Sequence, residues 1–215
     1  MDICVASLKD KIAKTFDCDV FASVADDGDA YKIGLLDLTD WRIESDPVLD
    51  ERDCARRLGL GHPQGVQGIL RQHYCVQQCN ALKSRYERDN GFRYDWVLRM
   101  RADSLFLTAI ENLATSDPNR IYIPRHDNWA IDGTHGLNDR LAFGSSALMD
   151  VYSNRLDALH EYVRCGGLFH PETFLGANLA RCGVTVERTR VMLTTVRKNG
   201  RRLPPARYRR FGDII

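Results

Sequence analysis

The chain has 215 residues, of which 44% are hydrophobic and 27% are charged, and its formal net charge is +1. This size and composition are typical of a globular domain that buries a core without stabilising disulfides or metals, and they exclude a chain that is disordered or polyanion-binding as a whole. We therefore expect one domain spanning residues 1–215.

The distribution of charge along the chain is uneven. Nine basic residues and no acidic residue lie between Arg188 and Arg210, so the remaining sequence carries 21 basic and 29 acidic residues. Two interpretations of the basic C-terminal segment, residues 197–215, are open: a solvated tail, and a segment that attracts an anionic substrate. Nucleic acid is not an expected partner, because only Tyr208 and Phe211 supply aromatic rings among these basic residues.

Cysteine content and hydropathy indicate the cellular compartment in which the protein is expected. The seven cysteines are odd in number and include no Cys-x-x-Cys pair, which favours reduced thiols over a disulfide framework. No run of about 18 apolar residues is present, so no membrane span is expected. The first residues include an acidic group and only a short apolar stretch, unlike a signal peptide. Together these features predict a cytoplasmic protein.

The first half of the chain contains short strand and helix patterns. Asp19 to Val24 is an apolar run with β-branched residues that predicts a buried strand, and it ends at a turn over Asp26 to Gly28. Residues 65–89 carry the clearest helical spacing, which the Asp89-Asn-Gly91 turn ends. We further expect a short strand over residues 2–8, a helix over 9–16, and a short strand with a loop over 31–53.

The second half of the chain predicts more strands and two helices. The expected strands cover residues 94–103, 120–124 and 141–144, with one or two further strands within 184–196. One helix is expected over 147–163 with Ser146 as its cap, and another over 170–182, ended by Gly183. Strands that alternate with helices indicate an α/β sheet with helices on its faces.

Charged residues occupy an unusual position in the expected strand over residues 94–103. Alternation in a strand places Arg99, Arg101 and Asp103 on one face, and Asp103 falls near the carboxyl end, where α/β sheets bind ligands. Unpaired buried charge is costly, so these groups require partners. Two interpretations are open: an internal Arg–Asp ion pair, and a site where Asp103 holds a divalent cation on a diphosphate that Arg101 also contacts.

Several segments resemble GT-A glycosyltransferases, which transfer a sugar from a nucleotide-sugar donor. The strand that leads to Arg101-Ala-Asp103 is similar to the strand that ends in their Asp-x-Asp motif, and more narrowly to a group with Arg-x-Asp in that place. The resemblance extends to a glycosyltransferase domain of a chlorella-virus protein. The further matching segments, in order, are Leu70-Arg-Gln-His-Tyr74, Arg93-Tyr-Asp-Trp96, Asn138-Asp-Arg-Leu-Ala-Phe-Gly-Ser145 and His170-Pro-Glu-Thr-Phe174.

The resemblance implies a single-domain GT-A (Rossmann-like) α/β fold with a mixed, mostly parallel sheet and helices on both faces. It implies sugar transfer from a nucleoside-diphosphate sugar, in the first place a UDP-sugar, to a glycan or glycoprotein acceptor, in the host cytoplasm if the chain is viral. Asp103 matches the position that binds the diphosphate and a divalent metal, Mn²⁺ or Mg²⁺. Arg101 replaces the first aspartate of the motif and cannot ligate a metal, which implies weaker metal binding or partial replacement of the metal by guanidinium.

Other donor-binding positions follow from the same resemblance. Asp26 and Asp27 follow an early strand, where such enzymes contact the nucleotide, and a solvated turn is the alternative. Asn138 precedes the strand over 141–144, in a loop that faces the donor sugar or the acceptor. His170 is a candidate for binding diphosphate or sugar hydroxyls, and a structural hydrogen-bonding histidine is the alternative.

Two carboxylates are candidates for the catalytic base that deprotonates the acceptor hydroxyl. Glu172 resembles an acidic position that GT-A enzymes have at a helix start, although the helix dipole alone also favours a glutamate there. Asp139 lies in the loop before the strand over 141–144, and its alternative is a turn aspartate that bonds its own backbone.

Two further functions compete with glycosyl transfer. A nucleotidyltransferase-like enzyme needs a Gly-rich phosphate loop, but Gly59-Leu-Gly61 followed by Gly65 has the wrong spacing and follows no expected strand. A non-enzymatic sugar- or nucleotide-binding module predicts no hydrolysis of a nucleotide sugar, and ligand binding that survives the loss of Asp103.

Overall fold

The computed structural model describes residues 2–13, 16–54, 65–110, 113–126, 128, 136–197 and 199–203. The helices are α1 (Asp2–Leu8), α2 (Gly65–Asn90), α3 (Ser146–Ser153), α4 (Leu156–Arg164) and α5 (Pro171–Arg181), with short helical turns η1 (Lys9–Ala13), η2 (Ala30–Leu35) and η4 (Leu113–Thr115). The strands are β1 (Phe21–Ala25), β2 (Asp40–Glu44), β3 (Val97–Met100), β4 (Ser104–Phe106), β5 (Arg120–Pro124), β6 (Leu141–Gly144), β7 (Thr185–Thr189), β8 (Leu193–Val196) and β9 (Arg202–Leu203). This mixture confirms the α/β class.

In the described part of the chain, the strands form three small sheets rather than one large sheet. The central sheet has the order β3-β6-β5-β7, β1 pairs with β2, and β4, β8 and β9 form a third sheet. The expectation of a mostly parallel sheet is wrong for the described residues, because only β1/β2 and β5/β7 pair in parallel. β6 lies between β3 and β5 and runs antiparallel to both. Apolar patterning predicts that a strand is buried but does not encode its direction.

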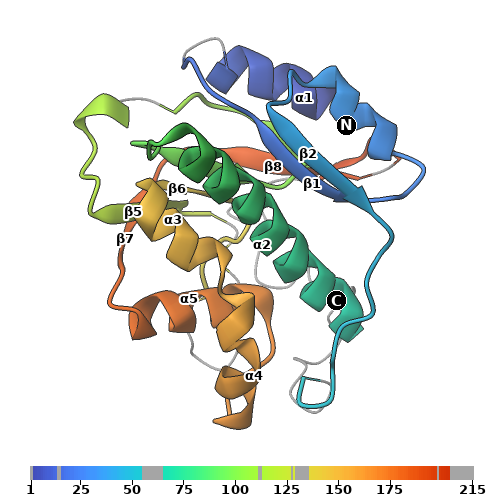
Figure 1. Cartoon of the computed structure of the whole chain (residues 1–215), viewed down its shortest axis with the longest axis vertical. Helices are drawn as coiled ribbons and strands as arrows, with labels where there is room; N and C mark the ends of the chain where they lie inside the picture. The colour runs from blue at the N-terminus through green and yellow to red at the C-terminus, as the bar shows by residue number, and fades with distance from the viewer. Residues whose placement is uncertain are drawn as a thin grey trace.

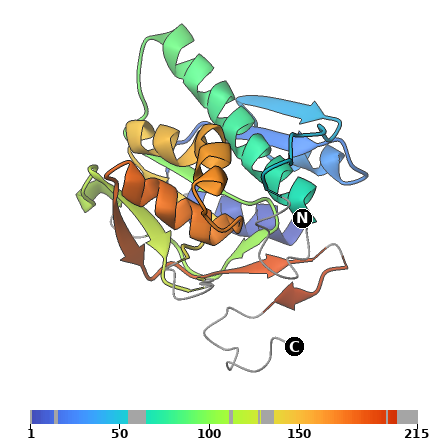
Figure 2. The ribbon, with the colours of Figure 1, turned by 90° about the horizontal axis from the view of Figure 1, so that it is seen from below.

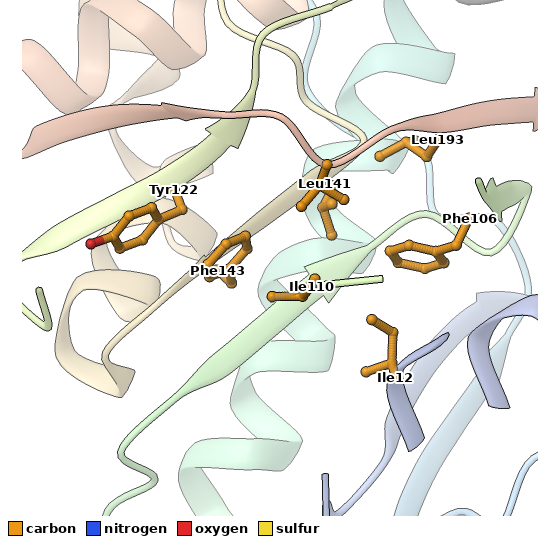
Figure 3. Close-up of a cluster of buried hydrophobic side chains, with 8 residues drawn as sticks. Ile12, Phe106, Ile110, Tyr122, Leu141, Phe143 and Leu193 are labelled. Atoms are coloured by element: carbon orange, nitrogen blue, oxygen red, sulfur yellow. The ribbon is translucent and has the colours of Figure 1, made fainter. Parts of the chain in front are cut away.

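The central sheet separates two layers of the core (Figures 1 and 2). Ile121 and Ile123 of β5 pack with residues of α2, α3 and α5 on one face. Tyr122 points to the other face, where it stacks on Phe143 with ring centroids 5.0 Å apart. Figure 3 shows these two rings beside Leu141, and the same cluster includes Ile12 of η1. Successive side chains of a strand therefore pack into opposite layers of the core, as strand geometry requires.

Helix α2 confirms the longest element expected from the sequence. Its buried positions include Ile69, Leu70, His73 and Val76, which recur at helical spacing. Gly91 follows the last residue with φ of 70°, the left-handed conformation that favours glycine after a helix. Among the described helices, none is both long enough and apolar enough to cross a membrane.

Three expected elements differ from the structure. Residues 2–8 form a helix rather than a strand, because Cys4, Val5 and Ile12 bury one face at helical rather than alternating spacing. The expected strand over 94–103 is shortened to β3, since the Ser104 amide donates to the Arg101 carbonyl at 3.0 Å and closes a turn. The expected helix over 147–163 is divided.

The division of that helix turns a charged residue inward. Helix α3 ends at Ser153 and α4 begins at Leu156, with Arg155 between them. Arg155 is only 1% exposed, so the break places its guanidinium in the interior instead of on a helix surface. Ser145, rather than Ser146, stands at the N-cap position of α3.

Candidate functional site

Three segments that are distant in sequence meet at one edge of the central sheet. Strand β3 pairs with β6 so that Met100 lies opposite Leu141, and the Arg101 amide donates to the Arg140 carbonyl at 3.0 Å. The start of α5 joins them, because the Leu137 amide donates to the backbone carbonyl of Glu172 at 3.0 Å. The β3–β4 turn, the segment before β6 and the start of α5 are therefore neighbours.

Charged side chains from these segments and from the α3–α4 junction make up what we call the arginine cluster. Its members are Arg99, Arg101, Asp103, Asp139, Arg140, Arg155 and Glu172. Asp139 is the shared neighbour, since its carboxylate acts electrostatically on the other buried groups. Most of the cluster is withdrawn from water, where charge–charge interactions are stronger than at the surface.

Arg101 and Asp103 form a two-pronged ion pair across the β3–β4 turn. Arg101 Nε donates to Asp103 Oδ1 at 3.0 Å, and Nη2 donates to Oδ2 at 2.8 Å. Burial by itself lowers the pKa of Arg101, but the carboxylates of Asp103 and Asp139 outweigh it, so the pKa is raised and the guanidinium stays charged. Both oxygens of Asp103 are thus engaged, in the planar geometry that arginine favours.

Arg99 and Arg155 lie near the same tyrosine ring. Arg99 Nη1 donates to the backbone carbonyl of Asp139 and to the Tyr152 hydroxyl, the latter at 3.3 Å. The Arg155 guanidinium carbon lies 4.6 Å from the centre of the Tyr152 ring, and Nη1 donates to the Tyr152 carbonyl at 2.7 Å. Burial, reinforced by the positive charge of Arg99, lowers the pKa of Arg155. The two guanidiniums therefore repel each other in a poorly hydrated setting.

Asp139 is the buried counter-ion of this cluster. Its side chain is 3% exposed, and Gln72 of α2 donates from Nε2 to Oδ2. Burial raises the pKa of Asp139, but the guanidiniums of Arg101, Arg99 and Arg155 more than compensate, so the pKa is lowered. A carboxylate held ionised in this way is a weak proton acceptor at neutral pH.

Glu172 has the opposite electrostatic setting. It lies in the first turn of α5, and burial followed by the negative charge of Asp139 raises the pKa of its carboxyl to about 8. Oε2 lies 3.4 Å from His170 Nδ1 and has no hydrogen-bond partner by geometry. Two neighbouring carboxyls whose pKa values are pushed apart in this manner are a common signature of acid–base sites.

Unpaired polar atoms accompany the cluster on its α2 side. Arg155 Nε and Nη2 and both ring nitrogens of His73 are buried without a hydrogen-bond partner. Burial, followed by the charge of Arg155, holds the pKa of His73 well below its ordinary value, so this imidazole is neutral. Among the described residues, the four arginines of the cluster supply four positive charges, whereas Asp103 and Asp139 supply two negative ones. The arrangement is suited to an anionic ligand.

The remaining sequence-predicted residues have other positions. Asn138 is fully buried and holds the backbone: its Nδ2 donates to the His126 carbonyl at 2.8 Å and its Oδ1 accepts from the Arg140 amide at 2.8 Å. Asp26 and Asp27 are exposed in the turn after β1, where the Asp27 side chain accepts from the Asp29 amide at 2.9 Å. The structure thus brings Asn138 to the edge of the cluster but leaves Asp26 and Asp27 in a solvated turn.

The basic C-terminal segment is described only in part. Arg202 and Leu203 form β9 on the edge of β8. The expectations for residues 204–215, and for Lys198, lie outside the described residues.

Arg155 of the cluster and the neighbouring His73 were not among the sequence candidates. Arg155 follows Tyr152 by three residues and precedes Leu159 by four, so its helical spacing places it on an apolar stripe. His73 likewise follows Ile69 by four residues on the buried face of α2. A charged or polar residue at such a position is a signal that was present in the sequence, because these residue types are rarely buried without a reason.

The surroundings of Asp103 differ from those of the metal site that the resemblance implies. Asp103 offers no free carboxylate oxygen, since both accept from Arg101. In the described part of the chain, no group of three or more His, Cys, Asp or Glu side chains is arranged to hold a metal ion. The residues present therefore do not fit a divalent-cation site at Asp103.

Comparison with known proteins yields one assignment. No curated protein matches the chain. A family model matches residues 1–211, which is almost the entire sequence. The chain therefore belongs to the family described as "Domain of unknown function (DUF7796)".

Proposed function

We propose that the protein is a glycosyltransferase of the GT-A kind, which transfers a sugar from a nucleoside-diphosphate sugar, in the first place a UDP-sugar, to a hydroxyl of a glycan or glycoprotein. The arginine cluster is its active site in this proposal. The donor diphosphate lies against the guanidiniums, and the acceptor hydroxyl lies toward Glu172.

One observation carries the proposal. Three of the segments that resemble GT-A enzymes are far apart in sequence, yet their residues Arg101 and Asp103, Asp139, and Glu172 converge in one cluster. A fourth such segment, Leu70 to Tyr74, joins them through the hydrogen bond from Gln72 to Asp139. The segment Arg93 to Trp96 supplies no member of this cluster, and Arg93 pairs with Asp150 instead. Placing this much charge together in the interior is costly, and a shared anionic ligand offsets that cost.

The two carboxyls receive different roles from their electrostatic settings. Glu172 accepts the proton of the acceptor hydroxyl in this proposal. Its pKa is raised to about 8, and a base whose pKa lies near the working pH is partly deprotonated and still binds a proton strongly. Asp139, whose pKa is lowered, stays ionised and orients the guanidiniums around it. The leaving nucleoside diphosphate gains negative charge as the bond between the sugar and its phosphate breaks. A guanidinium already in place stabilises that charge.

A panel of UDP-, GDP- and CMP-sugars tests the proposal by thermal shift and by slow donor hydrolysis. We expect UDP-sugars to raise the melting temperature most, with a stabilisation of about 2.7 kcal/mol at a hundredfold excess over the dissociation constant. Glu172→Gln should lower the transfer rate by about 10²–10⁴ while leaving donor affinity nearly unchanged.

The same panel separates the competing functions. Absence of a melting shift with every nucleoside diphosphate would contradict the proposal. Binding without hydrolysis or transfer to any acceptor would identify a binding module instead. That outcome has some support in the structure, since Asp103 is already occupied by Arg101.

A further inference from the structure

The Arg101–Asp103 pair stands where GT-A enzymes are expected to hold a divalent cation on the donor diphosphate. Its geometry differs from a cation site in one decisive respect: both oxygens of Asp103 accept hydrogen bonds from the same guanidinium, at 3.0 and 2.8 Å. A cation at Asp103 would have to share these oxygens with a guanidinium that repels it, or the pair would have to break. Breaking a partly buried Arg–carboxylate pair exposes both charges and is costly.

The surrounding charge also opposes a cation. Asp139, the other ionised carboxylate of the cluster, interacts with Arg101, Arg99 and Arg155 together. A divalent cation entering this cluster would meet more positive than negative groups, so its binding would be weakened by repulsion. The same excess of positive charge attracts a diphosphate directly.

Unpaired donors provide an independent indication of an anion. Arg155 is 1% exposed, and its Nε and Nη2 are buried without a hydrogen-bond partner. Buried donors left without an acceptor are rare, because each costs free energy comparable to a lost hydrogen bond. A phosphate oxygen, or a water that bridges to one, satisfies such donors.

From these observations, and resting on the proposed function, we infer that the donor diphosphate is bound by guanidinium groups without a divalent cation. Arg101 contacts the phosphate that becomes the leaving group, and Asp103 is a positioning residue that orients Arg101 through its paired hydrogen bonds. Arginine can serve both partners because Nε and Nη2 donate to Asp103 while the Nη1 edge presents further N–H groups to a phosphate. The guanidinium also keeps its charge at any physiological pH.

Calorimetric titration of the whole chain with UDP, inorganic pyrophosphate and uridine tests the inference, with each ligand measured in EDTA and in Mn²⁺ at equal ionic strength. We expect UDP affinity to be equal within about twofold in the two buffers. Pyrophosphate should bind in EDTA, and uridine, which lacks the diphosphate, should bind at least about tenfold more weakly than UDP.

Two variants test whether Arg101 and Asp103 are responsible for binding UDP without a metal. Arg101→Gln should weaken UDP binding about 10- to 100-fold in EDTA, whereas Arg120→Gln, which removes a surface arginine paired with Asp117, should not. Asp103→Asn should weaken binding in EDTA as well, because it frees Arg101 from its fixed orientation. A metal ligand at this position would instead affect only the Mn²⁺ measurement.

Failure of this inference is distinct from failure of the proposed function. UDP binding that requires Mn²⁺ and disappears in EDTA would overturn the inference and leave glycosyl transfer standing. Absence of UDP binding in both buffers would overturn both. The comparison of buffers uses the unmodified chain, so it remains decisive even if Arg101→Gln does not fold.

Discussion

Two partly buried charge networks lie on the flanks of helix α2, and they differ in their balance of positive and negative charge. The first, which we call the lysine network, consists of Lys83, Glu87, Arg93, Ser146 and Asp150. Lys83 Nζ lies 2.7 Å from both Ser146 Oγ and Asp150 Oδ1 and 3.1 Å from Glu87 Oε2. It contains two cations and two carboxylates, and it fastens α2 to the start of α3.

The arginine cluster lacks this balance. It has more guanidiniums than ionised carboxylates, its Glu172 carboxyl has a raised pKa, and Arg155 retains unpaired donors. The lysine network also holds a buried oxygen without a hydrogen bond, Glu87 Oε2, but that oxygen lies 3.1 Å from Lys83 Nζ. A neutral network contributes to stability, whereas one with excess positive charge is incomplete without an anion. The difference indicates that the lysine network is structural and that the arginine cluster is functional.

The largest effect on the free energy of unfolding is expected for a substitution in the lysine network. Lys83→Met removes the buried cation that Glu87 and Asp150 share, and Arg93, whose side chain is 56% exposed, remains as the cation of the network. We expect a loss of about 3–5 kcal/mol in the free energy of unfolding, measured by urea denaturation, with no recovery when phosphate is added. Arg88→Met, which removes an exposed arginine of the same helix, is the control and should change little. A small effect of Lys83→Met would mean that the network is not the structural one.

Asp139→Asn is expected to have the next largest effect. It removes the counter-ion that Arg99, Arg101 and Arg155 share, so we expect a loss of roughly 2–3 kcal/mol in urea denaturation. Unlike Lys83→Met, this variant should regain part of its stability in phosphate or pyrophosphate, because an added anion replaces the lost carboxylate. If anions restore neither variant, the proposed contrast between the networks does not hold.

Glu172 makes stability depend on pH in a defined direction. Its pKa is raised to about 8 in the folded chain, against a reference value of 4.5, so the folded state binds the proton more tightly than the unfolded chain does. This contribution to stability is complete below pH 4.5 and is lost as the pH rises toward 8. Glu172→Gln should therefore be more stable than the unmodified protein at pH 8–9, by about 1–2 kcal/mol.

Melting temperatures between pH 5 and 9 check this expectation. The difference between Glu172→Gln and the unmodified chain should grow with pH, and a difference that is constant or shrinks would mean that Glu172 ionises normally. Glu161→Gln, on the exposed surface of α4, is the matched control.

Arg155→Met is expected to have the smallest effect on stability. It removes a buried charge that Arg99 repels and keeps an apolar side chain of similar length against Tyr152. We expect a change within about 1 kcal/mol, since replacing buried charge by packed apolar groups is often neutral. Pyrophosphate affinity should nevertheless fall, which Arg164→Met on the exposed side of α4 should not reproduce. A loss of stability comparable to that of Lys83→Met would make Arg155 a structural residue.

The sequence by itself determined the elements with strong local signals. The helix over Gly65–Asn90, the strands Arg120–Pro124 and Leu141–Gly144, and the helix that starts at Pro171 follow from periodicity and from residues that end or begin elements. The sequence also pointed to Arg101 and Asp103, because charged residues in an expected strand demand partners, although both lie in the turn after β3.

Only the tertiary structure decided which charges meet and which remain ionised. The pairing of β3 with β6 brings Arg101 to Arg140 and Asp139, and the break between α3 and α4 turns Arg155 toward the same point. The opposite pKa shifts of Asp139 and Glu172 depend on burial and on neighbours up to about 70 residues away in sequence, such as Arg101. Local patterns cannot contain this information, since electrostatic energy depends on distance in space and on exclusion of water, and both are fixed only when the chain has folded.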